Sequence, residues 1–408
     1  MEDINDNILN IVAEFFAYFG QKETFTLLLA IDREKVYDDF LKAEAGFNSY
    51  KLAFLDKGIN NSPYQNQVEN YPEHLTRLPN LAIPGAKVFP NVGELPDIDE
   101  QALNFIHPDI KEACICLAGT AGGPFKSRWL GRNSLDKCQY WSSTKIIAVL
   151  NVICSINGDI NKCKICGDGK KLDFNEVVED IFTYGEKIGS SNALSAMFKC
   201  FQNYVDLESW LKEITGNNHT EFQGLYGEEP FIFSPQITQD DRVLLSAVSE
   251  SKKRAEQPGE NTVATYDLTK IMSMVGCYYH LPESAKLSGM SWENLQPFIR
   301  NAGKDTSRYV DVALEKLGIQ NSIKYPVILS KLGFGYSSSR KRTELTYTCF
   351  TQFEYQQKVR SIAMTLRGAK ALGDFDKEAV EIDARMATEV TEIMRRLVTD
   401  ELGSTINN

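Results

Sequence analysis

The sequence predicts a mixed α/β (α+β) fold in which an antiparallel sheet is flanked by helices and a helical subdomain is inserted. Three observations lead to this fold class. Two strands joined by a tight turn are expected early, within residues 113–131, and three more strands are expected within residues 325–366. Between them, residues 151–310 show the three-and-four spacing of apolar residues that is typical of helices. The late strands have short connections, which favour antiparallel neighbours.

The first 110 residues are expected to be an extension of helices and irregular chain. Helices are expected at about 7–19 and 31–55, and a stretch rich in Pro and Asn follows from 60 to 99. The first residues are acidic where a signal peptide would be basic. We therefore predict a cytoplasmic protein, or an extracytoplasmic one if a signal peptide has been removed.

Residues 111–150 and 311–408 are expected to form one discontinuous α/β subdomain. Its expected strands are 113–118, 125–131, 325–334, 344–353 and 359–366. Its C-terminal helix has an apolar stripe formed by Met386, Val390, Ile393 and Leu397. Residues 151–310 are expected to form an all-helical subdomain, which includes a helix at 262–279 and a charged, solvated linker at 249–261.

The composition is that of a soluble globular protein, with 43% hydrophobic and 24% charged residues. The net charge of −11 argues against nucleic acid as a partner, and no apolar run is long enough to span a membrane. We expect a small-molecule or peptide substrate, while the oligomeric state stays open. The nine scattered cysteines indicate reduced thiols. For Cys163-x-x-Cys166, the candidate further zinc ligands are Cys154 and His219, but we expect no metal.

The segment Trp141-Ser142-Ser143-Thr144-Lys145 opens an apolar helical run. A serine three residues before a lysine lies on the same helix face, about 5–6 Å away between Cβ atoms. A desolvated, neutral lysine amine can accept the proton of a serine hydroxyl. Ser142 and Lys145 are therefore a candidate nucleophile and base that need no histidine.

Two later segments carry side chains that suit the same chemistry. Gly189-Ser190-Ser191-Asn192 lies at an expected helix start, where Ser190 can pass a proton from Lys145 to a leaving group and Asn192 can hold an amide. Lys331-Leu332-Gly333 lies in a late strand. There Lys331 supplies a positive charge and Gly333 leaves room for a substrate beside the strand, where the next N–H can bind an oxyanion.

The ordered set Ser-x-x-Lys, Ser-x-Asn and Lys-x-Gly resembles the signature of the penicillin-recognising serine hydrolases, which include class A β-lactamases and D-alanyl-D-alanine peptidases. The resemblance covers roughly residues 112–402. It implies a serine hydrolase that forms an acyl-enzyme with a β-lactam, a peptide amide or an ester, without a cofactor. It also implies that Ser142 is the nucleophile, Lys145 the base and Ser190 the proton relay. Asn192 would hold the substrate amide, and Lys331 would orient Ser190 and attract a substrate carboxylate. The N–H groups of Ser142 and of Phe334, beside Gly333, would form the oxyanion hole.

Two departures from the family pattern leave the substrate open. Leu332 occupies a position that is usually Thr or Ser, for which Ser337, Ser338 or Ser339 are candidate substitutes. Glu228 and Glu229 lie at a plausible distance to be a deacylating glutamate, although the local sequence does not match the family's loop. The alternatives are therefore a catalytically weak or inactive binding or sensor protein with this fold, and a glutaminase-type amidase.

Overall fold

The computed structural model describes residues 27–248 and 260–402 of the 408-residue chain. The helix expected at 7–19 and most of the linker expected at 249–261 lie outside these ranges. In the described part of the chain, no helix is both long and apolar enough to cross a membrane.

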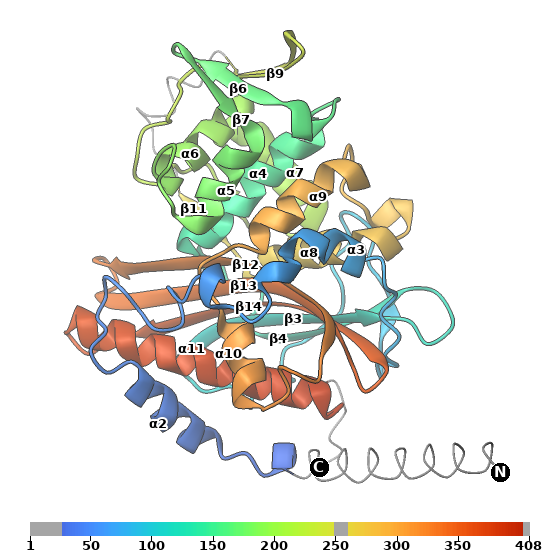
Figure 1. Ribbon diagram of the computed structural model, residues 1–408, viewed down its shortest axis with the longest axis vertical. Coiled ribbons are helices and arrows are strands. Elements are labelled where there is room, and N and C mark those ends of the chain that lie inside the picture. The colour runs from blue at the N-terminus through green and yellow to red at the C-terminus, as the bar shows by residue number, and fades with distance from the viewer. Residues whose placement is uncertain (1–26, 249–259, 403–408) are drawn as a thin grey trace, which may run out of the picture.

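A seven-stranded sheet crosses the middle of the molecule (Figure 1). Its order is β1-β4-β3-β14-β13-β12 with antiparallel neighbours, and β2 pairs with β4 in parallel. The strands are β1 (Lys87–Val88), β2 (Ile98–Asp99), β3 (Ile110–Gly119), β4 (Lys126–Arg132), β12 (Lys324–Ser337), β13 (Arg342–Tyr355) and β14 (Lys358–Lys370). The predicted fold class, an antiparallel sheet flanked by helices, is confirmed.

Helices cover both faces of this sheet (Figure 1). On one face lie α2 (Arg33–Ala43), α10 (Tyr309–Lys316) and α11 (Phe375–Val398). Successive side chains of a strand point to opposite faces, so Ile115 packs into the core beside α11 while Cys116 packs into the core on the other side. The sheet thus separates two apolar cores.

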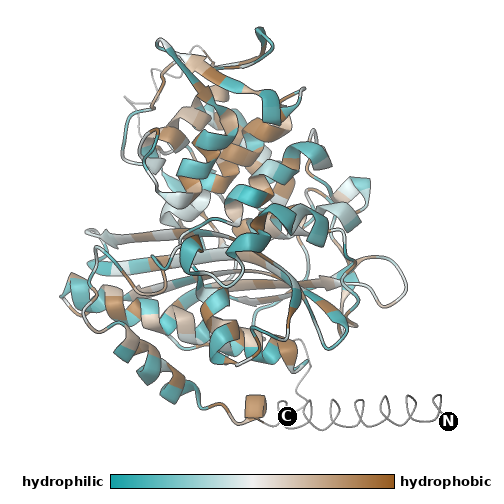
Figure 2. Cartoon of the chain, viewed as in Figure 1, coloured by the Kyte–Doolittle hydropathy of each residue, from teal (hydrophilic) through white to brown (hydrophobic). Residues whose placement is uncertain are grey.

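The second face carries the helical lobe. Its helices are α3 (Tyr71–His74), α4 (Lys145–Ser155), α5 (Phe174–Thr183), α6 (Ser191–Phe198), α7 (Tyr204–Thr215), α8 (Thr265–Gly276) and α9 (Trp292–Ala302). Figure 2 shows both hydrophobic and hydrophilic segments on these helices, as expected where one side of a helix is buried and the other exposed.

Residues 151–310, expected to be all-helical, differ from that prediction because they also contain short strands. These are β6 (Lys164–Gly167), β7 (Lys170–Asp173), β8 (Glu221–Phe222), β9 (Gln236–Gln239), β10 (Arg242–Ser246) and β11 (Asn261–Val263), the last of which pairs with β5 (Cys138–Gln139). The β6–β7 hairpin turns at Asp168-Gly169, where both residues have positive φ. Asp-Gly is a strong signal for such a two-residue hairpin turn, and the helical periodicity of the flanking segments obscured it.

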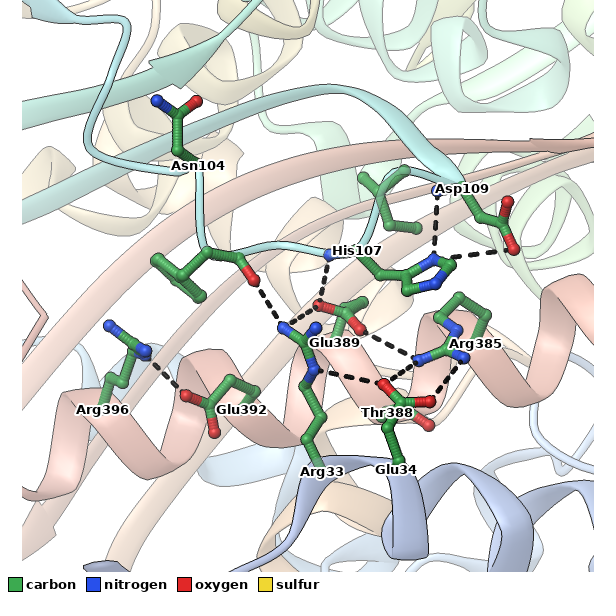
Figure 3. A network of polar contacts seen from close by, with 12 residues as sticks. Arg33, Glu34, Asn104, His107, Asp109, Arg385, Thr388, Glu389, Glu392 and Arg396 are labelled. Carbon is green, nitrogen blue, oxygen red and sulfur yellow. Dashed lines mark hydrogen bonds and ion pairs between the residues drawn. The ribbon is translucent and has the colours of Figure 1, made fainter.

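Charged side chains fasten helix α2 to α11 (Figure 3). Arg385 of α11 contacts Glu34 at 3.2 Å and Glu389 at 3.5 Å. Glu389 is fully buried, lies 3.5 Å from Arg33, and accepts a 3.0 Å hydrogen bond from the backbone N–H of His107. Each buried charge of this network therefore has an opposite charge beside it.

Candidate active site

Ser142 lies in a 3₁₀ helix (Trp141–Thr144) that runs directly into α4. Trp141, the residue before it, has a φ of 51°, a left-handed conformation that is strained for a bulky side chain. Its indole N–H donates to Glu344 at 3.2 Å, and its ring lies against Gly335, where a Cβ atom would come within 2.6 Å of the ring. These contacts hold the strained turn that presents Ser142.

Ser142 opens onto a cleft of about 520 Å³. Its lining residues are Gln139, Trp141, Ser142, Asn192, Leu225, Tyr226, Gly227, Glu260, Asn261, Thr262, Phe334, Ser339 and Arg340. Three of the residues singled out from the sequence, Ser142, Asn192 and Phe334, therefore line one cavity. A substrate in this cleft has access to the Ser142 hydroxyl.

Lys145 lies below the cleft and is fully buried. Its Nζ donates to Ser191 Oγ at 2.9 Å and to Asn192 Oδ1 at 2.8 Å. Burial, and then the charge of Lys331, lower the pKa of Lys145 to about 6, although Glu228 acts in the opposite direction. Near pH 7 most of this amine is neutral. The two N–H groups of the neutral amine then donate to Ser191 and Asn192, and its lone pair can accept a proton.

In the second motif it is Ser191, and not Ser190, that contacts Lys145. Ser190, expected as the relay, caps α6 by accepting a 3.1 Å hydrogen bond from the N–H of Ala193, and it donates to Glu228. Ser191 instead contacts Lys145 and donates to the carbonyl of Ile181 at 2.9 Å. Because Ser191 spends its proton on that carbonyl, it accepts from Lys145.

Asn192 is engaged on both sides of its amide. Its Oδ1 accepts from Lys145, and its Nδ2 donates to Glu228 Oε1 at 3.0 Å. Of the two glutamates considered from the sequence, the structure thus brings Glu228 to the other polar groups. Holding a substrate amide, the role expected for Asn192, requires a change in these contacts.

Lys331 lies on β12, with its amine fully buried. Its Nζ donates to the hydroxyl of Tyr184 at 2.5 Å and lies 3.7 Å from Asp305. Burial lowers the pKa of Lys331 to about 8, and Asp305 opposes this shift. The expected contact of Lys331 with Ser190 is replaced by one with Tyr184.

Tyr184 is a residue that the sequence analysis missed. Burial and Asp305 raise its pKa well above the usual value, and an interaction with the Ser142 hydroxyl lowers it in part. Its hydroxyl accepts the hydrogen bond from Lys331. Within the described residues, Ser142 makes no hydrogen bond to Lys145. Tyr184 ends α5 in a left-handed conformation, and nothing in its local sequence distinguishes it from an ordinary helix end.

Gly333 has a different role from the expected one. A Cβ atom at this position would overlap the carbonyl oxygen of Tyr140 and come within 2.9 Å of Ser143 Oγ. The space that was expected to admit a substrate is therefore filled by the serine-bearing turn. Glycine is needed here because the strand and this turn approach closely.

The residues around Gly333 face different environments. Phe334 lines the cleft and stacks on Phe375, with ring centroids 6.0 Å apart. Leu332 packs into the core beside α11. Of the serines considered as substitutes for the missing hydroxyl, Ser339 lines the cleft beside Arg340, which is held by Glu344 at 2.7 Å.

No group of three potential metal-ligating side chains occurs in the part of the chain that the structure describes. The Cys163 thiol donates to the carbonyl of Asp159, and Cys166 lies 3.5 Å from Thr238 Oγ1.

No protein-family model matches the chain, and a search of curated proteins found no match. Solved structures do match it. A class A β-lactamase from Mycobacterium abscessus has 11% identity and a TM-score of 0.41, and the match covers 72% of this chain and 98% of that one. A representative class A β-lactamase from Bacteroides cellulosilyticus has 10% identity, a TM-score of 0.43, and coverage of 72% and 96%. PBP-A has 10% identity, a TM-score of 0.44, and coverage of 78% and 100%. The proposed function therefore rests on the residues of the cleft and not on these identities and TM-scores.

Proposed function

We propose that the protein is a serine hydrolase of the penicillin-recognising type, in which Ser142 is acylated by a β-lactam, a peptide amide or an ester. The observation that carries this proposal is the state of Lys145. A fully buried amine with a lowered pKa and two neutral hydrogen-bond acceptors has a lone pair available three residues from a serine hydroxyl at the cleft.

Acylation requires the Ser142 hydroxyl to come within hydrogen-bond reach of Lys145. The amine takes the proton, and Oγ attacks the carbonyl carbon of the substrate. We assign the Tyr184 hydroxyl, which accepts a hydrogen bond from Lys331, as the group that passes a proton to the leaving group, and the ammonium of Lys331 returns a proton to it. We assign the oxyanion hole to the N–H groups of Ser142 and Phe334, two residues that line the cleft.

Glu228 is our candidate for the group that activates water in deacylation. Its carboxylate already accepts hydrogen bonds from Ser190 and Asn192. This engagement also favours a second candidate function, a sensor that is acylated but hydrolyses its acyl-enzyme slowly. Pre-steady-state kinetics separate the two, since a sensor gives one burst of product and a hydrolase continues to turn over.

Acyl probes test the proposal directly. We expect a fluorescent penicillin, or a broad activity-based acyl probe, to label the peptide that contains Ser142. The Ser142→Ala variant should lose the label, and Ser143→Ala should keep it. Absence of label on Ser142 with both classes of probe would contradict the proposal, and glutamine hydrolysis without such labelling would favour an amidase with another nucleophile.

A further inference from the structure

One wall of the cleft, residues 222–228, brings two side chains to the proposed catalytic groups. The ring of Tyr226 lies 5.6 Å from Lys145 Nζ, and its hydroxyl donates to the carbonyl of Thr144 at 3.3 Å. Glu228 contacts Asn192 at 3.0 Å. The wall is irregular beyond the two-residue strand β8, so its own secondary structure does not fix these side chains.

Lys199 holds this wall from behind. It follows directly after α6, and only 1% of it is exposed. Its Nζ donates to the carbonyl of Gly224 at 2.6 Å, to the carbonyl of Phe222 at 3.3 Å, and to Asn261 Oδ1 at 2.7 Å. An ammonium has three N–H donors, and three acceptors surround it. A neutral amine would leave one of them without this donor.

Two further contacts extend the anchor along the wall. The Nδ2 of Asn261 donates to the carbonyl of Leu225 at 3.2 Å. The ring of Tyr226 lies 5.3 Å from Lys199 Nζ, so this ring is close to the amines of both Lys145 and Lys199. Helix α6 therefore carries Ser191 and Asn192 at its start, and Lys199, directly after its end, holds the wall that faces them.

We propose that Lys199 is a positioning residue, whose ammonium holds residues 222–228 so that Tyr226 covers Lys145 and Glu228 stays on Asn192. The role of Lys145 as the base that activates Ser142 rests on the proposed function. Without the anchor, water reaches the amine of Lys145 and stabilises its protonated form. A smaller fraction of that amine is then neutral at pH 7, and acylation slows.

The Lys199→Met variant tests this inference. We expect the midpoint of the pH dependence of acylation to rise by at least about one pH unit. At a pH well below the midpoint, this shift reduces the neutral fraction of the Lys145 amine about tenfold. At high pH, acylation should recover toward the wild-type rate. Lys199→Arg restores donors and should lie closer to wild type.

Lys270→Met is the matched control. Lys270 is also buried and donates to two backbone carbonyls, those of Pro90 at 3.1 Å and Asn91 at 3.3 Å, but it does not line the cleft. We expect that variant to acylate with an unchanged midpoint. A folded Lys199→Met protein with the wild-type midpoint would overturn the inference, as would an equal shift in Lys270→Met. If Lys199→Met does not fold, Asn261→Ala should shift the midpoint in the same direction, and an unchanged midpoint would overturn the inference.

A second readout does not depend on turnover. In protein labelled with ¹⁵N at the lysine side chains, NMR reports the pKa of Lys145, with Lys145→Met used for assignment. A higher pKa of Lys145 in Lys199→Met supports the positioning role even if acyl probes fail on the wild type. An unchanged pKa of Lys145 in a protein whose Ser142 is labelled overturns the inference on Lys199 alone.

Discussion

Two groups of buried ionisable side chains, on opposite faces of the central sheet, have different kinds of partner. Beside α11, Arg385 contacts Glu34 and Glu389, and Arg395 contacts Glu392 and Glu401 at 2.7–3.0 Å. Beside the cleft, Lys145 is held by a hydroxyl and a side-chain amide.

This difference separates structural charges from chemically useful ones. An arginine that meets carboxylates keeps its charge and fixes the elements that it joins. A lysine that meets neutral acceptors in a dry environment loses its proton more easily and becomes a base at neutral pH. Burial of a cation alone therefore does not indicate a site. Lys199 and Lys270 are also buried among neutral acceptors, and Lys145 differs from them because it lies three residues after a serine that lines the cleft.

Removal of the buried amine should give the largest effect on function. We expect Lys145→Met to slow acylation of Ser142 about 10³-fold, because the general base is lost. The same variant should be more stable than wild type. The unfolded chain binds one more proton between about pH 6 and the ordinary lysine pKa, so wild-type stability rises with pH in this window.

The substitution removes that dependence on pH. We expect a gain of roughly 2 kcal/mol in the free energy of unfolding at pH 7, less than the full pKa shift because Ser191 and Asn192 lose a donor. Denaturant titrations at several pH values measure it. Lower stability of Lys145→Met at pH 6, together with unchanged acylation, would contradict the contrast between the two faces.

The corresponding change beside α11 should affect stability and not chemistry. Arg385→Met leaves the buried Glu389 with a weaker set of partners, and we expect a loss of about 3 kcal/mol in the free energy of unfolding. Lys377→Met, on an exposed part of the same helix, should cost less than about 0.5 kcal/mol. Acylation of the folded fraction should be unchanged in both, and a slowed rate in folded Arg385→Met would show that the two faces are coupled.

Removal of one hydroxyl should give the smallest effect. Tyr184→Phe keeps the ring beside Lys331 but removes the hydroxyl that accepts from Lys331 and that we assign to the proton path. We expect acylation to slow about 10- to 100-fold with little change in stability. Tyr336→Phe, on an exposed part of β12, serves as the control and should acylate at the wild-type rate. Equal rates for all three proteins would exclude Tyr184 from the proton path.

The elements that could be predicted from the sequence are those set by local patterns. The long strands and the start of α4 follow from alternation and from helical spacing, and the order of the three motifs identified Ser142, Asn192 and Phe334, which line one cleft. The short hairpin at Asp168-Gly169 lies inside a region of strong helical periodicity, and that periodicity dominated the prediction.

The parts that could not be predicted depend on contacts between distant segments. Tyr184 and Asp305 reach Lys331 from two different loops, and neither has a sequence pattern that indicates it. The choice between Ser190 and Ser191 depends on which residue caps α6, and apolar spacing alone does not locate the first residue of a helix. Gly333 matched its motif, but only the packed turn shows that a neighbouring backbone, and not a substrate, requires the glycine.

The central claim is that Lys145 acts on Ser142 as a neutral amine near pH 7. The most direct test is the rate of Ser142 acylation measured from pH 5 to pH 10 with one acyl probe. We predict a rate that rises with a midpoint near pH 6, the pKa of Lys145 in the folded protein, and reaches a plateau by pH 8. A rate that is still rising at pH 10 would mean that Lys145 keeps its proton, and would contradict the account.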